Sequence, residues 1–128
     1  MRILLVDDED AILQIASGVL EQAGHTVTTS HNNEDALRLY QNGAYELVLT
    51  DAEHLAPVWQ NPDGGEGLIL AEAIRKRNPQ QPIGFVTAHH HPIETYPSLP
   101  KPFTRDELLR FITEVVQGKA LPSSSGEN

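Results

Sequence analysis

The feature that most constrains the fold is a short apolar run that passes directly into acids near the start of the chain. Residues 3–6 read Ile-Leu-Leu-Val, and each of the next four positions, 7–10, carries a carboxylate. An unbroken apolar run of this length is too short for a helix and is typical of a strand buried on both faces of a sheet. The sequence therefore predicts a central strand that ends in a cluster of acids.

A second stretch has the same form, because residues 47–50 (Leu-Val-Leu-Thr) run into Asp51. If the two strands are parallel neighbours, Asp7, Asp8 and Asp51 meet at one edge of the sheet. Carboxylates about 5 Å apart repel each other by roughly 3 kcal/mol per pair at an effective dielectric constant of about 20. Such a cluster favours a divalent cation, and oxygen ligands of this kind suit Mg²⁺.

Strands and helices are expected to alternate along the whole chain. Strands are expected over residues 3–6, 25–29, 45–51, 83–87 and about 96–100. Helices are expected over residues 10–22, from an N-cap at Asn32 or Asn33 to Gly43, over 68–77 and after a Thr104–Glu107 capping box. This order predicts an α/β fold with a doubly wound parallel sheet between two layers of helices. Thr87 and Lys101 are then expected at the same strand-end edge as the acids.

The first and last predicted helices each carry an apolar stripe at helical spacing. In the first helix it comprises Ile12, Ile15, Ala16, Val19 and Leu20. In the last helix it comprises Leu108, Leu109, Ile112, Val115 and Val116. These two faces are expected to pack on the sheet.

The composition bounds the kind of protein. A chain of 128 residues with 39% apolar content fits one domain, expected over 1–118 and followed by a disordered tail or linker over 119–128. No apolar run approaches the roughly 18 residues of a membrane span, and no export signal is recognisable, so a cytoplasmic location is expected. The absence of cysteine excludes thiolate metal sites. A net charge of −9 disfavours direct binding to nucleic acid or to a membrane and favours a protein partner.

Four elements stand in order along the chain: the acid pair after the first strand, Asp51 after the third, Thr87 after the fourth and Lys101-Pro102 before the last helix. This pattern resembles the receiver domains of two-component response regulators, over roughly residues 1–117. The resemblance implies a flavodoxin-like five-stranded sheet of order 2-1-3-4-5. It also implies a phosphoacceptor signalling domain and not an enzyme that turns over a separate substrate.

The same resemblance implies a role for each residue of the expected site. Mg²⁺ would be held by Asp7, Asp8, Asp51 and the backbone carbonyl of Glu53. Asp51 would accept a phosphoryl group from a sensor histidine kinase, a phosphotransfer protein or a small phosphodonor, while Lys101 and the cation neutralise the transferring oxygens. The phosphorylated domain would then signal to a downstream protein through direct contacts.

Further positions follow from the resemblance. Thr87 would hydrogen-bond the phosphoryl group, Ala88 would leave space beside it, and the Lys101–Pro102 peptide bond would be cis. The aromatic switch position of the family falls on Ser98, and Tyr96 is the nearest aromatic residue.

Each of these residues also has a purely structural interpretation. The acids at 7–10 suit the first turn of a helix, Asp51 could cap a turn, and Lys101 could be a solvated surface charge. Their joint placement at the ends of separate strands favours the receiver interpretation.

The chain departs from the receiver pattern in the loop after Asp51. The glycine expected to open the third helix is Gly67, which follows Asp51 by 16 residues, so the loop is longer than in typical receivers by about 8 residues. We hypothesise that Leu55, Val58 and Trp59 of this loop fold over exposed sheet.

A second departure lies between Thr87 and Lys101, which are 14 residues apart. The crossover must return along a strand of roughly 17 Å, whereas eight helical residues rise only about 12 Å. Only an extended connection fits, and the sequence therefore predicts that the helix found here in receivers is replaced by an extended segment.

His89, His90 and His91, together with His54, suggest a transition-metal site as an alternative. Adjacent residues of an extended chain point to opposite sides, so at most two of the three neighbouring histidines share a face. We favour polar loop residues beside the site.

Two other functions fit parts of the pattern. A non-phosphorylated pseudo-receiver, acting as an interaction module, is favoured by the lost helix and opposed by the complete acid, hydroxyl and lysine set. A haloacid-dehalogenase-like phosphatase has a similar opening motif, here Asp8-Glu9-Asp10, but the late acid pair of that family is absent.

Overall fold

The chain folds around a parallel five-stranded sheet of order β2-β1-β3-β4-β5. The computed structural model describes residues 1–51, 65–87 and 96–118. The strands are β1 (Arg2–Val6), β2 (Thr26–Ser30), β3 (Leu47–Thr50), β4 (Ile83–Thr87) and β5 (Ser98–Pro100). The predicted doubly wound sheet and its strand order are confirmed. β5 is the shortest strand and lies at an edge of the sheet, where the prolines at 97 and 100 are tolerated.

Four helices lie within the described residues, and two of them begin at side-chain caps that the sequence indicates. They are α1 (Asp10–Gln22), α2 (Asn33–Asn42), α3 (Gly65–Arg77) and α4 (Arg105–Gln117). Asn32 caps α2 by accepting a hydrogen bond from the backbone N–H of Asp35. Thr104 and Glu107 form the predicted capping box of α4. None of the helices in this part of the chain is long and apolar enough to cross a membrane.

The predicted start of α3 is wrong. The helix begins at Gly65, so that Gly67 lies inside it instead of opening it. Glycine marks a helix boundary in a sequence because it costs roughly 1 kcal/mol in a helix interior. That cost is small beside the stabilisation expected from burying Leu70 and Ile74 on the same helix.

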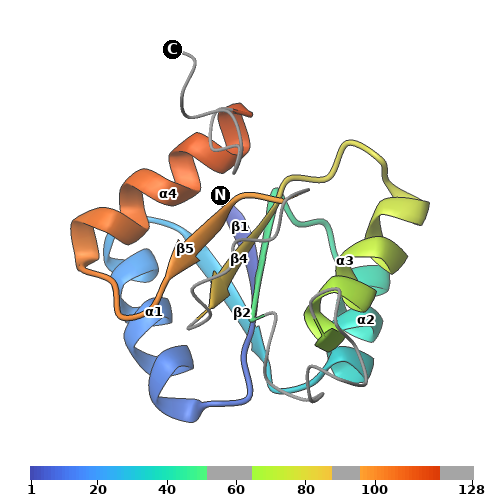
Figure 1. Cartoon of the computed structure of the whole chain (residues 1–128), viewed down its shortest axis with the longest axis horizontal. Helices are drawn as coiled ribbons and strands as arrows, with labels where there is room; N and C mark the ends of the chain where they lie inside the picture. The colour runs from blue at the N-terminus through green and yellow to red at the C-terminus, as the bar shows by residue number, and fades with distance from the viewer. Residues whose placement is uncertain (52–64, 88–95, 119–128) are drawn as a thin grey trace.

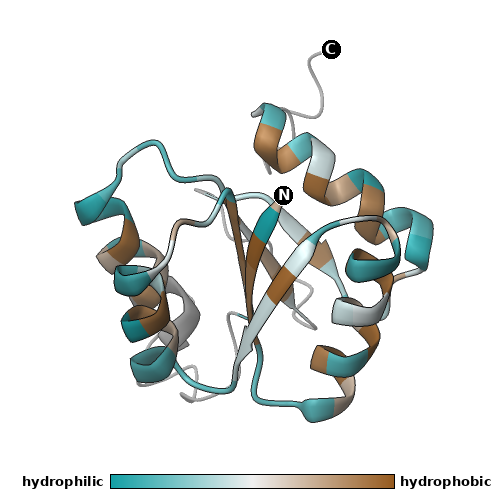
Figure 2. Ribbon diagram, turned by 180° about the vertical axis from the view of Figure 1, so that it is seen from behind, coloured by the Kyte–Doolittle hydropathy of each residue, from teal (hydrophilic) through white to brown (hydrophobic). Residues whose placement is uncertain are grey.

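The helices form one layer on each face of the sheet. α1 and α4 cover one face, and α2 and α3 cover the other (Figure 1). β1 serves both layers, since Ile3 and Leu5 pack in the core with α1 and α4, whereas Leu4 and Val6 pack in the core with α2 and α3. Figure 2 shows hydrophobic residues along the strands and on the helix sides next to them. The unbroken apolar run of β1 is therefore explained by burial on both faces.

The apolar stripes of the first and last helices were predicted correctly in part. Ile15 of α1 is 59% exposed and Val116 of α4 is 39% exposed, because both lie at the flank of the buried stripe. Leu13 and Phe111, which the predicted stripes omit, are buried instead. The spacing of apolar residues identifies the buried side of a helix, but it does not determine which residue forms the centre of that side to better than about one position.

Some predictions fall outside the described residues. The loop over 52–64 contains Glu53 and His54, together with the apolar group at 55, 58 and 59. Residues 88–95 contain Ala88, the neighbouring histidines and the segment expected to be extended. These predictions, and that of a tail over 119–128, remain predictions.

Replacing Gly84 by alanine is expected to destabilise the domain by about 1–3 kcal/mol. Gly84 lies in β4 under α4, and an added Cβ would stand 2.8 Å from Cε2 and 3.0 Å from Cζ of Phe111. Because Phe111 is buried, the contact can be relieved only by a shift of the helix or the ring. Urea denaturation measures the loss.

Gly18→Ala is the matched control for this prediction, because a Cβ at Gly18 meets no atom of the described part of the chain within 4 Å. Alanine in the α1 interior should stabilise the domain by roughly 0.5–1 kcal/mol. Equal stabilities of the two variants would contradict the close packing of Gly84.

Candidate functional site

β1 and β3 deliver two buried acids to the same edge of the sheet. Val6 and Thr50, the last residues of these neighbouring strands, are register partners. The next residues, Asp7 and Asp51, are 1% and 3% exposed. The backbone N–H of Asp51 donates to the carbonyl of Val6, at 3.1 Å, which ties the two strand ends together. The predicted convergence of these acids is therefore present.

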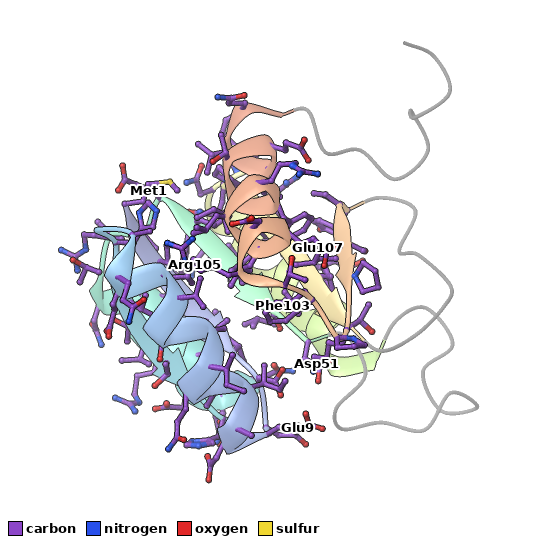
Figure 3. The ribbon with its side chains drawn as sticks, turned by 90° about the vertical axis from the view of Figure 1, so that its left-hand side faces the viewer. Met1, Glu9, Asp51, Phe103, Arg105 and Glu107 are labelled. Atoms are coloured by element: carbon purple, nitrogen blue, oxygen red, sulfur yellow. The ribbon has the colours of Figure 1, made fainter. Side chains whose placement is uncertain are left out.

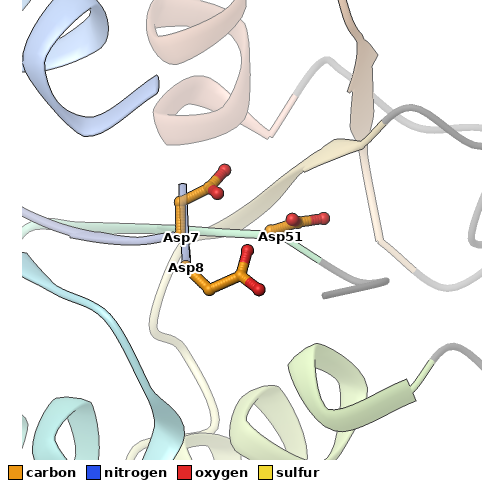
Figure 4. A group of neighbouring side chains, drawn as sticks. All are labelled: Asp7, Asp8 and Asp51. Carbon is orange, nitrogen blue, oxygen red and sulfur yellow. The ribbon is translucent and has the colours of Figure 1, made fainter. Parts of the chain in front are cut away.

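Asp8 completes a group of three carboxylates. One carboxylate oxygen from each of Asp7, Asp8 and Asp51 can be chosen so that all three lie within 4.8 Å of one another. Figure 4 shows the three side chains gathered at the strand ends. Asp8 is exposed, so the cluster opens to solvent on its side. Three hard oxygen donors at this spacing, two of them buried, fit a divalent cation such as Mg²⁺.

Lys101, which directly follows the edge strand β5, reaches this cluster with its side chain. Its Nζ donates to Asp7 Oδ2 at 2.9 Å and to Asp51 Oδ2 at 3.4 Å. Its side chain is 11% exposed. Burial alone would lower the pKa of Lys101, but the hydrogen bond to Asp7 and the charges of Asp51, Asp7 and Glu9 outweigh it and raise the pKa above the ordinary lysine value. The ammonium is thus held charged between two buried carboxylates.

The position of Lys101 is fixed by its own backbone. Its N–H donates to the carbonyl of Thr87, at 2.9 Å, just past the β4–β5 pair. The Lys101–Pro102 peptide bond is cis, as expected. Thr87 is 2% exposed and closes β4 at the same edge as the acids. The structure therefore brings Asp7, Asp8, Asp51 and Lys101 together, with Thr87 at the adjoining strand end.

The two residues considered for the aromatic switch lie on the face that α3 covers. Ser98 is the register partner of Phe85 in β4, and its buried Oγ has no hydrogen-bond partner among the residues that the structure describes. Tyr96 is 7% exposed and packs against Phe85, with ring centroids 5.3 Å apart. The guanidinium carbon of Arg75 lies 5.3 Å from the centre of the Tyr96 ring. Tyr96 is thus part of the core and not a surface residue.

Two contacts at the rim were not predicted from the sequence. Glu9 Oε1 lies 3.9 Å from Lys101 Nζ, and His31 Nε2 lies 2.5 Å from Asp10 Oδ1. Figure 3 shows Glu9 at the start of α1, at the same end of the molecule as Asp51 and away from Met1. Both contacts join residues far apart in the chain, so no spacing signal predicts them.

Comparison with known proteins agrees with this arrangement. A family model described as the response regulator receiver domain matches residues 3–113. The nitrogen assimilation regulatory protein NtrX of Azorhizobium caulinodans is 30% identical over 121 residues, which is 88% of this chain and 25% of that protein. The chain spans about a quarter of the length of the NtrX relatives that it matches.

Solved structures give the same result. The response regulator protein TrrA of Thermotoga maritima, in complex with Mg(2+)-BeF, is similar with a TM-score of 0.75 at 31% identity, over 89% of this chain and 97% of that chain. TrrA in complex with the histidine kinase ThkA is similar with a TM-score of 0.72 at 32% identity, again over 89% and 97% of the two chains.

Proposed function

The chain belongs to the response regulator receiver domain family of two-component signalling, and on this premise we propose that it accepts a phosphoryl group on Asp51 in a Mg²⁺-dependent reaction. The observation that carries the proposal is the position of the Lys101 ammonium, 2.9 Å from Asp7 and 3.4 Å from Asp51. Asp51 is a buried acid beside the Lys101 ammonium and the carboxyl groups of Asp7 and Asp8, and these are the surroundings that phosphoryl transfer requires.

In the proposed reaction an Asp51 carboxylate oxygen attacks the phosphorus of the donor. The new O–P bond forms while the bond from phosphorus to the donor nitrogen or oxygen breaks, and the leaving group keeps the electron pair. Lys101 neutralises charge on the transferring oxygens, and the hydrogen bond to Asp7 keeps the ammonium in place. Thr87 is proposed to donate a hydrogen bond from its hydroxyl to the transferred group, and Ala88 is predicted to leave space beside it.

The proposed cation site comprises Asp7, Asp8 and Asp51, with the Glu53 carbonyl as an additional predicted ligand. When bound, Mg²⁺ supplies positive charge against the phosphoryl oxygens. The fit rests on the three carboxylates within 4.8 Å of one another and on the single lysine that faces them among the described residues. That lysine offsets only part of their negative charge.

We propose a sensor histidine kinase or a phosphotransfer protein as the donor and a downstream protein as the target. The similarity to TrrA, which forms a complex with the histidine kinase ThkA, supports the first of these. The net charge of −9 supports a protein target in preference to direct binding of nucleic acid by this domain. The pseudo-receiver alternative is disfavoured by the complete set of Asp7, Asp8, Asp51 and Lys101, and no finding supports the phosphatase alternative.

The proposal is tested by intact mass measurement after incubation with acetyl phosphate. The wild type is expected to gain one phosphoryl group in the presence of Mg²⁺ and none in EDTA. Asp51→Asn is expected to gain none, because the amide is not a nucleophile for this reaction. Asp106→Asn is the matched control, since Asp106 is an exposed acid of α4, and it should be phosphorylated like the wild type.

Two results would contradict the proposal. One is an adduct on Asp51→Asn at the wild-type level, which would place the acceptor elsewhere. The other is a wild type that gains no phosphoryl group from acetyl phosphate and binds no Mg²⁺ in calorimetry, which would favour the pseudo-receiver.

A further inference from the structure

Glu9 is an acid at the site that neither the proposed cation site nor the acceptor uses. It is the N-cap residue of α1, but its side chain makes no capping hydrogen bond. Its backbone N–H donates to Asp7 Oδ1 at 2.9 Å, which fixes its Cα beside the acid cluster. Its carboxylate is 62% exposed and lies 3.9 Å from Lys101 Nζ. The Glu9 side chain therefore faces Lys101 and, within the described residues, does not cap the helix that it precedes.

The charges around Lys101 are unequal. Asp7, Asp8, Asp51 and Glu9 bring four carboxyl groups together, and Lys101 is the cation that faces them within the described residues. Transfer of a phosphoryl group would add further negative charge at Asp51 and would require the ammonium for the new oxygens. A Glu9 carboxylate that attracts this ammonium and repels an anionic donor opposes the transfer, whereas the same charge attracts a divalent cation.

We propose that Glu9 sets the balance between cation affinity and phosphoryl acceptance at Asp51, because its carboxylate competes with the phosphoryl group for Lys101. Glu9 acts through Lys101 and is thus a positioning residue, not a catalytic one. The inference rests on the proposed function, because it assumes that Asp51 accepts the phosphoryl group.

Glu9→Gln keeps the shape of the side chain and removes its charge. This variant is expected to bind Mg²⁺ about 2- to 5-fold more weakly than the wild type. At saturating Mg²⁺, its rate of phosphorylation by acetyl phosphate is expected to be about 3-fold higher. Both values are those expected for an exposed charge about 4 Å from its partner. Calorimetry measures the first quantity and intact mass against time measures the second. Both differences should shrink as the salt concentration rises, because the effect is Coulombic.

Asp10→Asn is the matched control. Asp10 is the next acid in the chain and is 78% exposed, but it pairs with His31 and not with Lys101. This variant removes the same charge one residue away and should change the two quantities much less than Glu9→Gln does.

Opposite changes in Mg²⁺ affinity and phosphorylation rate in Glu9→Gln, with little change in Asp10→Asn, support the inference. A merely structural role of Glu9 would lower both quantities together. If the wild type is phosphorylated, three outcomes overturn this inference but leave the proposed function standing. Glu9→Gln changes Mg²⁺ affinity and phosphorylation rate in the same direction, it changes neither, or Asp10→Asn changes them as much as Glu9→Gln does. A wild type that is not phosphorylated overturns the proposed function, and this inference fails with it.

Discussion

Replacing Lys101 by methionine is expected to lower the free energy of unfolding by about 3 kcal/mol in EDTA, the cost of removing one partner from a buried ion pair. Methionine preserves much of the volume of the side chain but leaves Asp7 and Asp51, both at most 3% exposed, without the ammonium that lies between them. The repulsion between these carboxylates then acts in the folded state and is relieved by unfolding. Urea denaturation in EDTA measures the loss.

Mg²⁺ should separate the two roles of Lys101. A divalent cation at the acid cluster can replace the missing positive charge, so it is expected to recover most of the lost stability of Lys101→Met. It should not recover phosphorylation, whose rate is expected to stay about 100-fold below that of the wild type, because the charge on the transferring oxygens is no longer neutralised from that side. A variant that regains stability and full phosphorylation together would contradict the role proposed for Lys101.

Lys76→Met is the matched control, since Lys76 is exposed on α3. It changes the net charge of the protein by the same amount. The free energy of unfolding should change by less than about 0.5 kcal/mol, and the phosphorylation rate by less than the roughly 2-fold that corresponds to this energy. A loss of stability in this control as large as in Lys101→Met would show that net charge, and not the local ion pair, is responsible.

The pH dependence of the Lys101 contribution has a definite sign. The pKa of Lys101 is raised in the folded protein by its hydrogen bond to Asp7 and by the nearby carboxylates, which outweigh the opposing effect of burial. Its stabilisation is therefore fully present below the ordinary lysine pKa and is lost as the pH rises through the folded-state value. The stability difference between the wild type and Lys101→Met should stay constant from neutral pH to about pH 9 and shrink only at higher pH.

The parts of the fold that could be predicted are those in which a short segment carries its own signal. β1 and β3 contain the short apolar runs 3–6 and 47–49, which lead to Asp7 directly and to Asp51 after Thr50. The capping box at Thr104 fixes the start of α4 in the sequence itself. Because parallel strands place their carboxyl ends at one edge, these local signals are enough to predict that Asp7 and Asp51 meet.

What could not be predicted depends on which segments meet in space. Ile15 lies beside buried positions in the helical pattern of α1, and only the placement of the sheet decides that Leu13 turns inward instead. The approach of Glu9 to Lys101 joins the ends of the first and last strands of the chain and leaves no trace in the spacing of residues. In the sequence, Tyr96 is identified only as the aromatic residue nearest to the switch position. Its packing in the core depends on where α3 and β4 lie, and the sequence does not show this.

Tyr96 therefore gives the second prediction with a large effect. Ten residues, 88–97, connect β4 to β5, and Tyr96 is the one next to last. Its ring packs against Phe85 and belongs to the buried cluster on the α3 side of the sheet, which also contains Leu70 and Ile74. The Arg75 guanidinium lies over the Tyr96 ring, and Arg75 Nε donates to the carbonyl of Gln81 at 2.9 Å. The ring thus fixes the entry to β5 against α3 and β4.

Tyr96→Ala is expected to lower the free energy of unfolding by about 3–5 kcal/mol, the usual cost of removing a buried aromatic ring. Tyr96→Phe keeps the ring and its contacts with Phe85 and Arg75, and should cost less than about 1 kcal/mol. Urea denaturation with an unchanged m-value measures both losses.

Tyr96→Ala should also be phosphorylated more slowly than the wild type under conditions where it remains folded, because β5 is only three residues long and Lys101 directly follows it. A small loss in Tyr96→Ala, equal to that in Tyr96→Phe, would mean that α3 and β4 hold the edge strand without this ring. Lys101 would then be held by its backbone hydrogen bond with Thr87 and its side-chain hydrogen bonds with Asp7 and Asp51, without support from Tyr96.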